Sequence, residues 1–357
     1  SAGLASSSSV FMVTAEAIVA LNGLSMTDEE FVQACGYGEW YVGTRGGCGD
    51  HAAMHYGRRG QVCHIELHPF RISYCPFPTG HSIVAFNSFE TAHKAGNARD
   101  IFNQRVACYE FGLMLIQTRH PDLRERLIYF RDINPNVVGD TATVYQLLRE
   151  LPQRASLDEV KQLLPYEMHE RVIQIASQHS PPKDGYPIRG VCLFGVAECE
   201  RSNRCTVLLS DGRVNEFGEL MNISHDGDRV AKLGDDGEMH TYASPCDDEH
   251  LQKLIASIHS DSSALRESAQ LWRQPGSYRC STPAIDFMVD VALSVDGVIG
   301  AQISGAGLGG CIMVLVRTDA VERLISAMTE YYYEPRSYEP CYVVGVPIAG
   351  SGVLTLN

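Results

Sequence analysis

Hydrophobic residues recur along this chain with two different spacings, and together they predict a protein of the α+β class. Apolar positions three and four residues apart are typical of a helix that buries one face. Thr27, followed three residues later by Glu30, predicts a capping box at the start of a helix that runs to about Tyr37. The same spacing predicts further helices over residues 12–24, 97–118, 156–164, 167–177, 190–209, 214–223, 284–293 and 320–331.

Short uninterrupted apolar runs, each bounded by Gly or Pro, predict the strands. One segment, residues 226–249, has neither kind of spacing. It contains three Gly and many acidic side chains, so we expect a loop insertion there and not a domain. The apolar runs predict strands over residues 62–67, 83–86, 298–303, 311–316 and 342–346.

Length, composition and charge narrow the class of protein. The 357 residues are enough for one large domain or two closely packed ones. Hydrophobic residues make up 45% of the chain and charged residues 20%, which is the profile of a globular protein with a substantial core. The net charge of −14 argues against a large phosphate-neutralising surface, so we expect no nucleic-acid partner.

The sequence also bears on the cellular compartment. Its longest apolar runs are far shorter than the ~20 residues of a membrane-spanning helix, and no signal-peptide pattern opens it. We therefore expect a soluble, cytoplasmic protein with no membrane partner. The twelve cysteines are dispersed without a Cys-x-x-Cys pair, which predicts reduced thiols. The chain opens on Ser1 and not on Met, which we interpret as a fragment, a processed chain or a numbering that begins inside a larger protein.

A run of small residues, Gly-Leu-Ala-Ser-Ser-Ser-Ser at positions 3–9, stands directly before the first predicted helix. Small residues let a ligand approach the backbone, and the first N–H groups of a helix have no partner within the helix. Because these groups also carry the positive end of the helix dipole, an anion such as phosphate can bind there. The run is not a P-loop, since no Gly-Lys-Ser/Thr closes it, and taken alone it also fits a flexible Ser-rich terminus.

A second glycine-rich segment, residues 300–310, joins two predicted strands. Five glycines in eleven residues are more than a hairpin turn requires, so we expect this backbone to approach either a ligand or another backbone. A tight strand connection is the alternative. The segment is not a dinucleotide-binding fingerprint, because a strand follows it and not a helix.

The third element is Gly-Gly-Cys-Gly-Asp-His at residues 46–51. An acid beside a helix start can orient a hydroxyl group and accept its proton, whereas the alternative makes Asp50 only the N-cap of a helix over residues 52–56. His51 and His55 have a spacing that suits zinc on a helix, but no Glu follows His51, so we expect no structural zinc. We expect Cys48 to be a small packed residue and not a nucleophile.

Together and in this order, these elements resemble the superfamily of galacto-, homoserine, mevalonate and phosphomevalonate kinases, and its galactokinases in particular. Residues 3–8 resemble the second motif of that family, Gly-Leu-Ser-Ser-Ser-Ala, and residues 304–311, Ser-Gly-Ala-Gly-Leu-Gly-Gly-Cys, resemble its third. Residues 47–51 stand where galactokinases have Gly-Ile-Met-Asp-Gln. Shorter matches are Phe-Asn-Gln-Arg at 102–105, Phe-Gly-Glu-Leu-Met at 217–221, Ser-His at 224–225 and Thr-Pro-Ala-Ile-Asp at 282–286.

The resemblance implies a two-lobed kinase fold with nucleotide and sugar in the cleft between the lobes. Residues 1–82 would be the remainder of the N-terminal lobe, and residues 83–357 the C-terminal lobe with an acidic insertion at about 226–250. The implied reaction is ATP-dependent phosphorylation of the anomeric hydroxyl of galactose or a galactose-like monosaccharide, with Mg2+ as cofactor. The resemblance implies no particular oligomeric state.

The resemblance also implies which residues form the site. Asp50 would be the catalytic residue, contacting the C1 hydroxyl as base or electrostatic orienter, and Ser7 and Glu39 would be the Mg2+ ligands. The residues implied to bind the ATP phosphates are Gly3, Leu4, Ala5, Ser6, Ser7 and Ser8. The residues implied to bind the sugar are Gly47, Asp50, Phe102, Gly305, Ala306 and Gly307.

Four features depart from the family's pattern. Its opening motif, Gly-Glu-His-x-Asp-Tyr, would precede Ser1 and is not in this sequence. Phe102 replaces a Tyr that contacts the sugar, which favours another epimer or a uronic acid. The family's Mg2+-binding Glu corresponds to Gly38, and Glu39 is one residue further on, which turns a helical side chain by about 100°. Finally, His51 replaces Gln.

Two other functions stay open on these grounds. The departures are also those expected of a catalytically inactive protein that binds sugar and ATP and acts as a sensor through protein contacts. A related kinase acting on mevalonate or homoserine has less support, because the short matches at residues 102–105 and 217–221 are typical of galactokinases.

Overall fold

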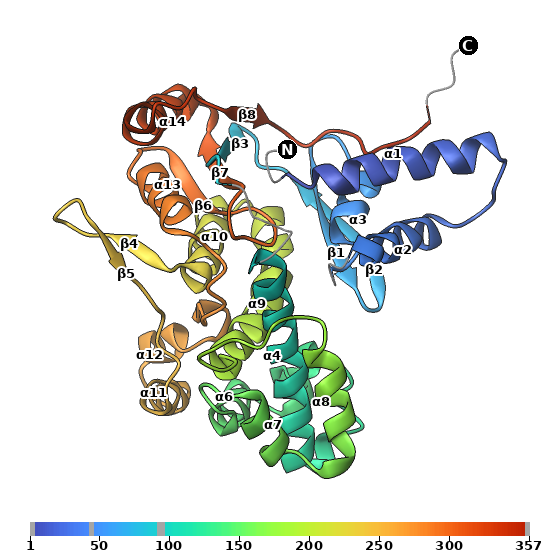
Figure 1. The fold of residues 1–357 in the computed structure, drawn as a ribbon. Helices are drawn as coiled ribbons and strands as arrows, with labels where there is room; N and C mark the ends of the chain where they lie inside the picture. Colours follow the sequence, from blue (N-terminus) through green and yellow to red (C-terminus); the bar gives the residue numbers. More distant parts are fainter. Residues whose placement is uncertain (1–3, 43–45, 91–96, 354–357) are drawn as a thin grey trace. The chain divides into compact units, whose positions relative to one another are not determined.

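The structure is a computed structural model that describes residues 4–42, 46–90 and 97–353. It mixes helices and strands, which confirms the predicted α+β class, and it divides into two compact units (Figure 1). Unit 1 comprises Ser1–Ala92, Arg204–Glu219 and Met288–Asn357, and unit 2 comprises His93–Asn203 and Leu220–Phe287. Three helices contribute residues to both units: α9 (Ile188–Ser210), α10 (Val214–Asp228) and α13 (Pro283–Leu293).

Unit 1 contains an antiparallel sheet with the strand order β6-β7-β3-β8. Strand β3 (His81–Asn87) pairs with β7 (Cys311–Arg317) on one side and with β8 (Tyr342–Gly345) on the other, and β6 (Val298–Ile303) pairs with β7. These strands agree with the apolar runs. The lobe boundary expected between residues 82 and 83 falls inside β3, and the residues on both of its sides belong to unit 1. Helix α14 (Val321–Met328) follows β7 along the chain.

Within the described residues 4–42 and 46–76, unit 1 forms three α-helices and a hairpin around a small core. The capping box at Thr27 and Glu30 is present. The core consists of Met12, Phe31, Val32, Cys35 and Ala52. The elements are α1 (Ser6–Leu21), α2 (Asp28–Glu39), α3 (Gly49–Tyr56), β1 (Gln61–Leu67) and β2 (Phe70–Pro76).

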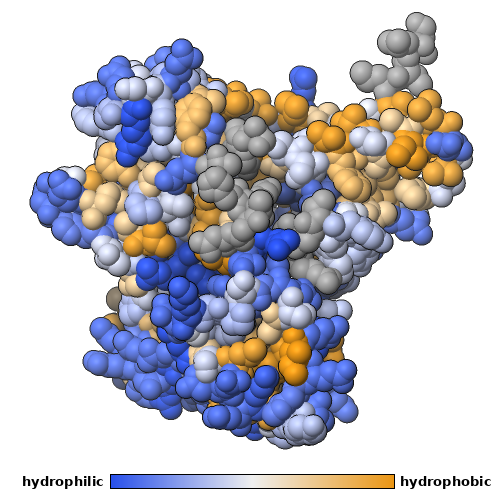
Figure 2. All heavy atoms as spheres, viewed as in Figure 1, coloured by the Kyte–Doolittle hydropathy of each residue, from blue (hydrophilic) through white to orange (hydrophobic). Residues whose placement is uncertain are grey.

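Helix α1 begins six residues earlier than the apolar spacing predicts. The serines at positions 6–9 therefore form its first turn and are not a segment that precedes it. The helix is apolar on more than its buried side: Val10, Val13 and Leu21 are 69%, 64% and 86% exposed. Figure 2 shows hydrophobic residues gathered over this helix.

Helix α10 approaches strand β6 so closely that neither partner has room for a side chain. A Cβ atom on Gly218 would lie 2.2 Å from the carbonyl oxygen of Ile299, and one on Gly300 would lie 2.6 Å from the carbonyl oxygen of Gly218. The Phe-Gly pair at residues 217–218 thus has a packing role. It fixes the strand that leads into the glycine-rich segment.

Unit 2 is mainly helical, as predicted for the middle of the chain. Its core gathers apolar side chains such as Phe111, Leu115, Val144 and Leu193. The spacing did not reveal α6 and α11, whose apolar faces contribute to this core. Besides α9, α10 and α13, the α-helices described in this unit are α4 (Asn97–Arg119), α5 (Pro135–Val138), α6 (Thr141–Glu150), α7 (Leu157–Leu163), α8 (His169–Ala176), α11 (Asp248–Ile258) and α12 (Ser263–Ser268).

The loop insertion predicted over residues 226–249 is wrong in part. The segment holds the end of α10, a hairpin of β4 (Ala231–Leu233) and β5 (Met239–Thr241), and the start of α11. Each strand of the hairpin has only three residues, and so short a strand leaves no periodic pattern in the sequence.

Two general expectations can be compared with the structure. All twelve cysteines lie in the described ranges and are free thiols, as predicted. Within residues 4–42, 46–90 and 97–353, none of the helices combines the length and the apolar character that crossing a bilayer requires.

A buried carboxylate explains two of the short family matches. The Asp286 side chain accepts hydrogen bonds from the backbone N–H groups of Val230 (2.9 Å) and Ala231 (2.8 Å), and Nε2 of the buried His225 lies 3.3 Å from its other oxygen. Burial alone would raise the pKa of Asp286, but the hydrogen bonds from His225 and the backbone outweigh it and lower that pKa. The Ser-His and Pro-x-x-Asp matches therefore have a structural role in unit 2.

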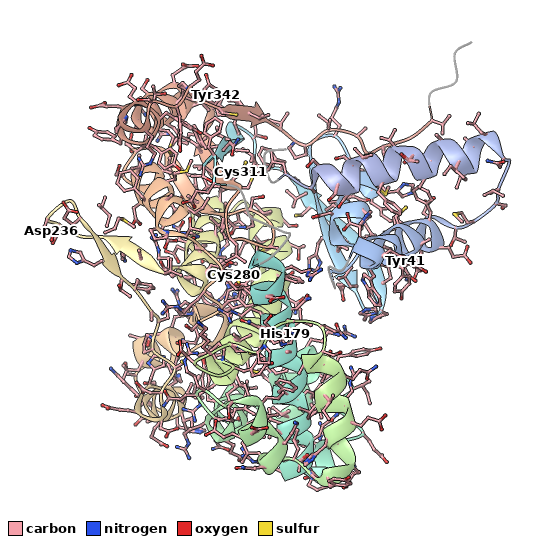
Figure 3. All side chains as sticks on the ribbon, viewed as in Figure 1. Tyr41, His179, Asp236, Cys280, Cys311 and Tyr342 are labelled. Carbon is pink, nitrogen blue, oxygen red and sulfur yellow. The ribbon has the colours of Figure 1, made fainter. Side chains whose placement is uncertain are left out.

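A second buried carboxylate of unit 2 is poorly compensated. Among the residues that the structure describes, Oδ1 of Asp228 accepts one long hydrogen bond, 3.4 Å, from the backbone N–H of Cys280, a residue labelled in Figure 3. Burial, reinforced by the nearby negative charge of Glu198, raises the pKa of Asp228 from 3.8 to about 7. The ionised form is thus unfavourable inside the folded protein.

We predict that Gly218→Ala destabilises unit 1 by roughly 1–3 kcal/mol, because the added methyl group overlaps the backbone of β6. Urea unfolding followed by circular dichroism measures the change as a lower midpoint. Gly345→Ala is the matched control, since no described atom lies within 4 Å of its Cβ position. Equal midpoints for Gly218→Ala and wild type would contradict the close approach.

We predict that Asp228→Asn stabilises the protein more as the pH rises. Since the folded pKa of about 7 exceeds the ordinary 3.8, the folded wild type holds an extra proton between these values. Its unfolding free energy therefore falls by up to about 1.4 kcal/mol per pH unit from pH 4 to 7, and the variant lacks this loss. Urea midpoints of both proteins at pH 5 and 7.5 test this, and a difference that is independent of pH would show that Asp228 is ionised throughout.

Candidate active site

The first turn of helix α1 presents its backbone N–H groups without a capping side chain from the described residues. Ala5 precedes the helix with φ of 46°, a left-handed conformation that a residue with a side chain rarely adopts. The turn contains no acidic residue, and Ser6 and Ser7 are exposed. The positive end of the helix dipole therefore favours an anion at this turn. Of the residues implied to bind phosphate, Leu4 to Ser8 lie here, and Gly3 lies outside the described residues.

Glu39, at the end of α2, is the acidic side chain that contacts this turn. The hydroxyl of the buried Ser8 donates a hydrogen bond of 2.8 Å to Oε1 of Glu39. Position 38, where the family's pattern places the acid, has no room for a side chain in this structure. A Cβ atom on Gly38 would lie 2.2 Å from Cζ of Phe11, so the α1 side chain occupies that space. The structure thus brings Glu39 to the turn, where its hydrogen-bond partner is Ser8, and the roles of Ser7 and Glu39 as Mg2+ ligands stay predictions.

Helix α3 carries Asp50 in its first turn. The N-cap residue is Cys48, which makes no capping hydrogen bond with its side chain, so the alternative that Asp50 caps the helix is wrong. Asp50 is exposed, and its carboxylate forms no hydrogen bond or ion pair with any residue that the structure describes. It is therefore available to an incoming hydroxyl group. Burial raises the pKa of the Cys48 thiol, which disfavours a nucleophilic thiolate there.

The first turns of α1 and α3 lie side by side in unit 1. The rings of Phe11 and His51 are 6.2 Å apart with an edge-to-face geometry, and Oγ of Ser9 is 3.7 Å from Sδ of Met54. Nε2 of His51 lies 3.8 Å from Oε1 of Glu39. The phosphate-binding candidate and the segment that carries Asp50 therefore meet around Glu39.

The glycine-rich segment between β6 and β7 needs glycine for its backbone conformation. Gly305 and Gly307 have φ of 71° and 81°, in the left-handed region, and Leu308 shares this conformation with φ of 64°. The end of the segment is held by another backbone, because the Ser88 N–H donates to the carbonyl of Gly310 and the Gly310 N–H donates to the carbonyl of Glu90. Gly305 and Ala306 at the tip are exposed.

In unit 2, the match at residues 102–105 is mostly architectural. The side chains of Asn103 and Gln104 donate to the carbonyls of Gln178 and Ser180, and Arg105 donates to the carbonyl of Tyr278. Phe102 precedes these three on α4 and is half-buried. Its contact with a sugar stays a prediction, as does that of Gly47, whose Cβ position faces Leu67.

The residues around Glu39 suit a small, hard cation. Carboxylate and hydroxyl oxygens are the donors that Mg2+ takes, and Glu39, with its side chain 23% exposed, can be reached from solvent. In the described part of the chain, no group of three or more His, Cys, Asp or Glu side chains is arranged to hold a metal. A cation here would need hydroxyl, water or phosphate ligands in addition to the carboxylate.

Sequence reasoning overlooked the contact between Ser8 and Glu39 and the position of His51 beside them. Each of the three positions had been noted only as part of a motif or as a departure from the family's pattern. What the three positions share is a polar side chain in or next to one of the motif segments, and Glu39 and His51 are also departures from the family's pattern. No spacing in the sequence connects α1, α2 and α3.

The chain is similar to known proteins of one superfamily. The family model described as "GHMP kinases N terminal domain" matches residues 1–58, and the model described as "GHMP kinases C terminal" matches residues 252–334. Galactokinase from Roseiflexus sp. (strain RS-1) is 23% identical over 334 residues, covering 93% of this chain and 62% of the relative. Galactokinase from Clostridium acetobutylicum is 24% identical over 344 residues, covering 96% and 65%. The chain thus spans less than two thirds of the length of these relatives.

The fold also has a solved counterpart. The galactokinase of Lactococcus lactis, crystallised with galactose, matches 99% of this chain with a TM-score of 0.60 and 19% sequence identity, over 68% of its own length. At this identity the likeness concerns the fold. The two family matches and the galactokinase relatives show that the chain is similar to galactokinase-like members of the GHMP kinase superfamily.

Proposed function

We propose that this protein is an ATP-dependent sugar kinase that phosphorylates the anomeric hydroxyl of galactose or a galactose-like monosaccharide. The observation that carries the proposal is the pairing of two helix starts in unit 1. The first turn of α1 is uncapped and free of acids, and it lies beside the start of α3, where Asp50 is exposed and unpaired among the described residues. The galactokinase relatives support the choice of sugar class.

The phosphates of ATP would bind at the N-terminal turn of α1. Residues Leu4 to Ser8, with Gly3 before them, would offer backbone N–H groups, and the helix dipole would stabilise the negative charge. Glu39 and a serine hydroxyl of this turn, Ser7 or Ser8, would hold Mg2+. When bound, that ion would neutralise charge on the transferring phosphoryl group.

Asp50 would orient the sugar hydroxyl and accept its proton. In the reaction, the C1 oxygen forms a bond to the γ-phosphorus while the bond between that phosphorus and the bridging oxygen breaks, so ADP leaves with the electron pair. The hydroxyl proton passes to the Asp50 carboxylate. The exposed tip at Gly305 and Ala306, with Gly307, Gly47 and Phe102, would contact the sugar.

Phe102 bears on the choice of sugar. A phenyl ring cannot donate or accept the hydrogen bond that a tyrosine would offer, so a sugar hydroxyl facing it would lose a partner. This favours a galactose-like sugar that lacks or repositions this hydroxyl. We also propose a cytoplasmic location, which the twelve free cysteines support because such thiols are typical of reducing compartments.

We predict that Asp50→Asn lowers kcat by about 10²–10⁴-fold, because the amide cannot take the proton, with little change in the Kd for ATP. Turnover with Mg·ATP across a panel of monosaccharides, using the complete gene product, measures this. Asp158→Asn, an exposed acid on α7, is the control and should behave as wild type. An unchanged kcat in Asp50→Asn would show that this residue does not take part in the mechanism. If the wild type binds sugar and ATP but shows no turnover, the protein would be a sensor and not a kinase.

We predict that Phe102→Tyr raises kcat/KM for galactose relative to its epimers by roughly tenfold, which is the effect of one regained hydrogen bond of about 1.4 kcal/mol. The measurement is the ratio of kcat/KM values for galactose, glucose and galacturonic acid in both proteins. The KM for ATP serves as the internal control. Identical sugar profiles would show that residue 102 does not face the sugar.

A further inference from the structure

A buried imidazole beside Glu39 has no hydrogen-bond partner among the described residues. The His51 side chain is 0% exposed, and neither of its ring nitrogens bonds to a residue that the structure describes. Buried polar atoms are nearly always paired, so an orphaned one calls for a ligand. The Nε2 atom faces the Glu39 carboxylate at 3.8 Å, a distance too long for a hydrogen bond.

Two further donor atoms lie close to one oxygen of the Glu39 carboxylate. Oγ of Ser8 and Nε2 of His51 lie 2.8 Å and 3.8 Å from the same Oε1 atom of Glu39. Donors held about 2.1 Å from one octahedral cation stand about 3.0 Å apart when adjacent and about 4.2 Å apart when opposite. The observed spacings fall close to that range. The edge-to-face contact with Phe11 covers the imidazole, and the partly exposed Glu39 leaves access from solvent.

The three donors are also three positions at which the sequence departs from the galactokinase pattern. Ser8 stands where the second motif has Ala, Glu39 is one residue beyond the expected Glu, and His51 replaces Gln. The chain positions are far apart, yet their side chains meet. Phe11 fills the space beside Gly38, so an acid at position 38 would not fit. The acid at position 39 instead lies beside Ser8 and His51.

We propose that Ser8, Glu39 and His51 form a divalent-cation site whose imidazole ligand shifts its preference from Mg2+ toward a first-row transition cation such as Mn2+ or Co2+. Mg2+ is bound almost wholly through oxygen, whereas an imidazole nitrogen strengthens binding of the transition cations. Water or phosphate oxygens would complete the coordination. The inference rests on the proposed kinase function only in the role that it gives the cation. Binding of the cation itself can be measured without sugar or ATP.

The test is Mn2+ binding to the nucleotide-free, full-length protein. Continuous-wave EPR of the free ion gives the Kd, competition with Mg2+ gives the preference, and pulsed EPR detects 14N coupling from a bound imidazole. We expect the nitrogen coupling in wild type and its loss in His51→Gln. The same variant should bind Mn2+ about 10–100-fold more weakly and show a correspondingly smaller preference over Mg2+.

His55→Gln is the matched control. His55 stands one turn further along α3, and it faces Glu16 and Asp28 at 3.7 Å and 3.3 Å. The control should keep both the nitrogen coupling and the affinity. If His55→Gln loses them while His51→Gln keeps them, the site belongs to the other cluster and the proposal fails.

Further outcomes are equally decisive. Glu39→Gln, at a partly exposed position, should also lose Mn2+ binding, and it replaces His51→Gln if thermal unfolding shows that the latter does not fold. Absence of nitrogen coupling in metal-loaded wild type would overturn the proposal. Normal Mn2+ binding without sugar phosphorylation would instead reject the kinase function and leave the cation site standing.

Discussion

The hydrogen bond from Ser8 to Glu39 is the contact on which the arrangement of the candidate site depends. It ties the first turn of α1 to the end of α2, two segments 31 positions apart, and it is largely shielded from water. On the side of α3, Nε2 of His51 lies 3.8 Å from the same Glu39 oxygen. Because a charge-assisted hydrogen bond in a partly buried place is stronger than one at the surface, it holds the serine turn of α1 against the end of α2.

Most of unit 2 and the sheet of unit 1 could be predicted from the sequence, because their patterns are long and regular. The long helix α4 and the apolar strand β7 show this plainly. The start of α1 could not, since its first turn consists of serines, which favour helix starts but carry no apolar period. The hairpin of β4 and β5 could not be predicted either, because strands of three residues are too short to show a recognisable alternation of apolar and polar residues.

For the candidate site, the sequence pointed to the segments but not to the contacts between them. Asp50 and Glu39 followed from a resemblance to a family, and the structure places both in unit 1. The partnership of Glu39 with Ser8 depends on Phe11 filling the space at Gly38, which is a matter of three-dimensional packing. Other family matches, such as Gly218 and Asp286, turn out to hold backbone segments in place, and a sequence match alone cannot separate such roles from chemistry.

Electrostatics gives the cluster around Glu39 a further consequence. A phosphate bound at the first turn of α1 would stand near the Glu39 carboxylate, since Ser8 belongs to that turn and contacts this acid. Two anions a few ångströms apart repel by several kcal/mol at the dielectric of a partly buried site, roughly 4 kcal/mol at 4 Å. The helix dipole offsets only about 1 kcal/mol of this. A divalent cation between them converts the repulsion into attraction on both sides, so a nucleotide should bind this turn well only together with the cation.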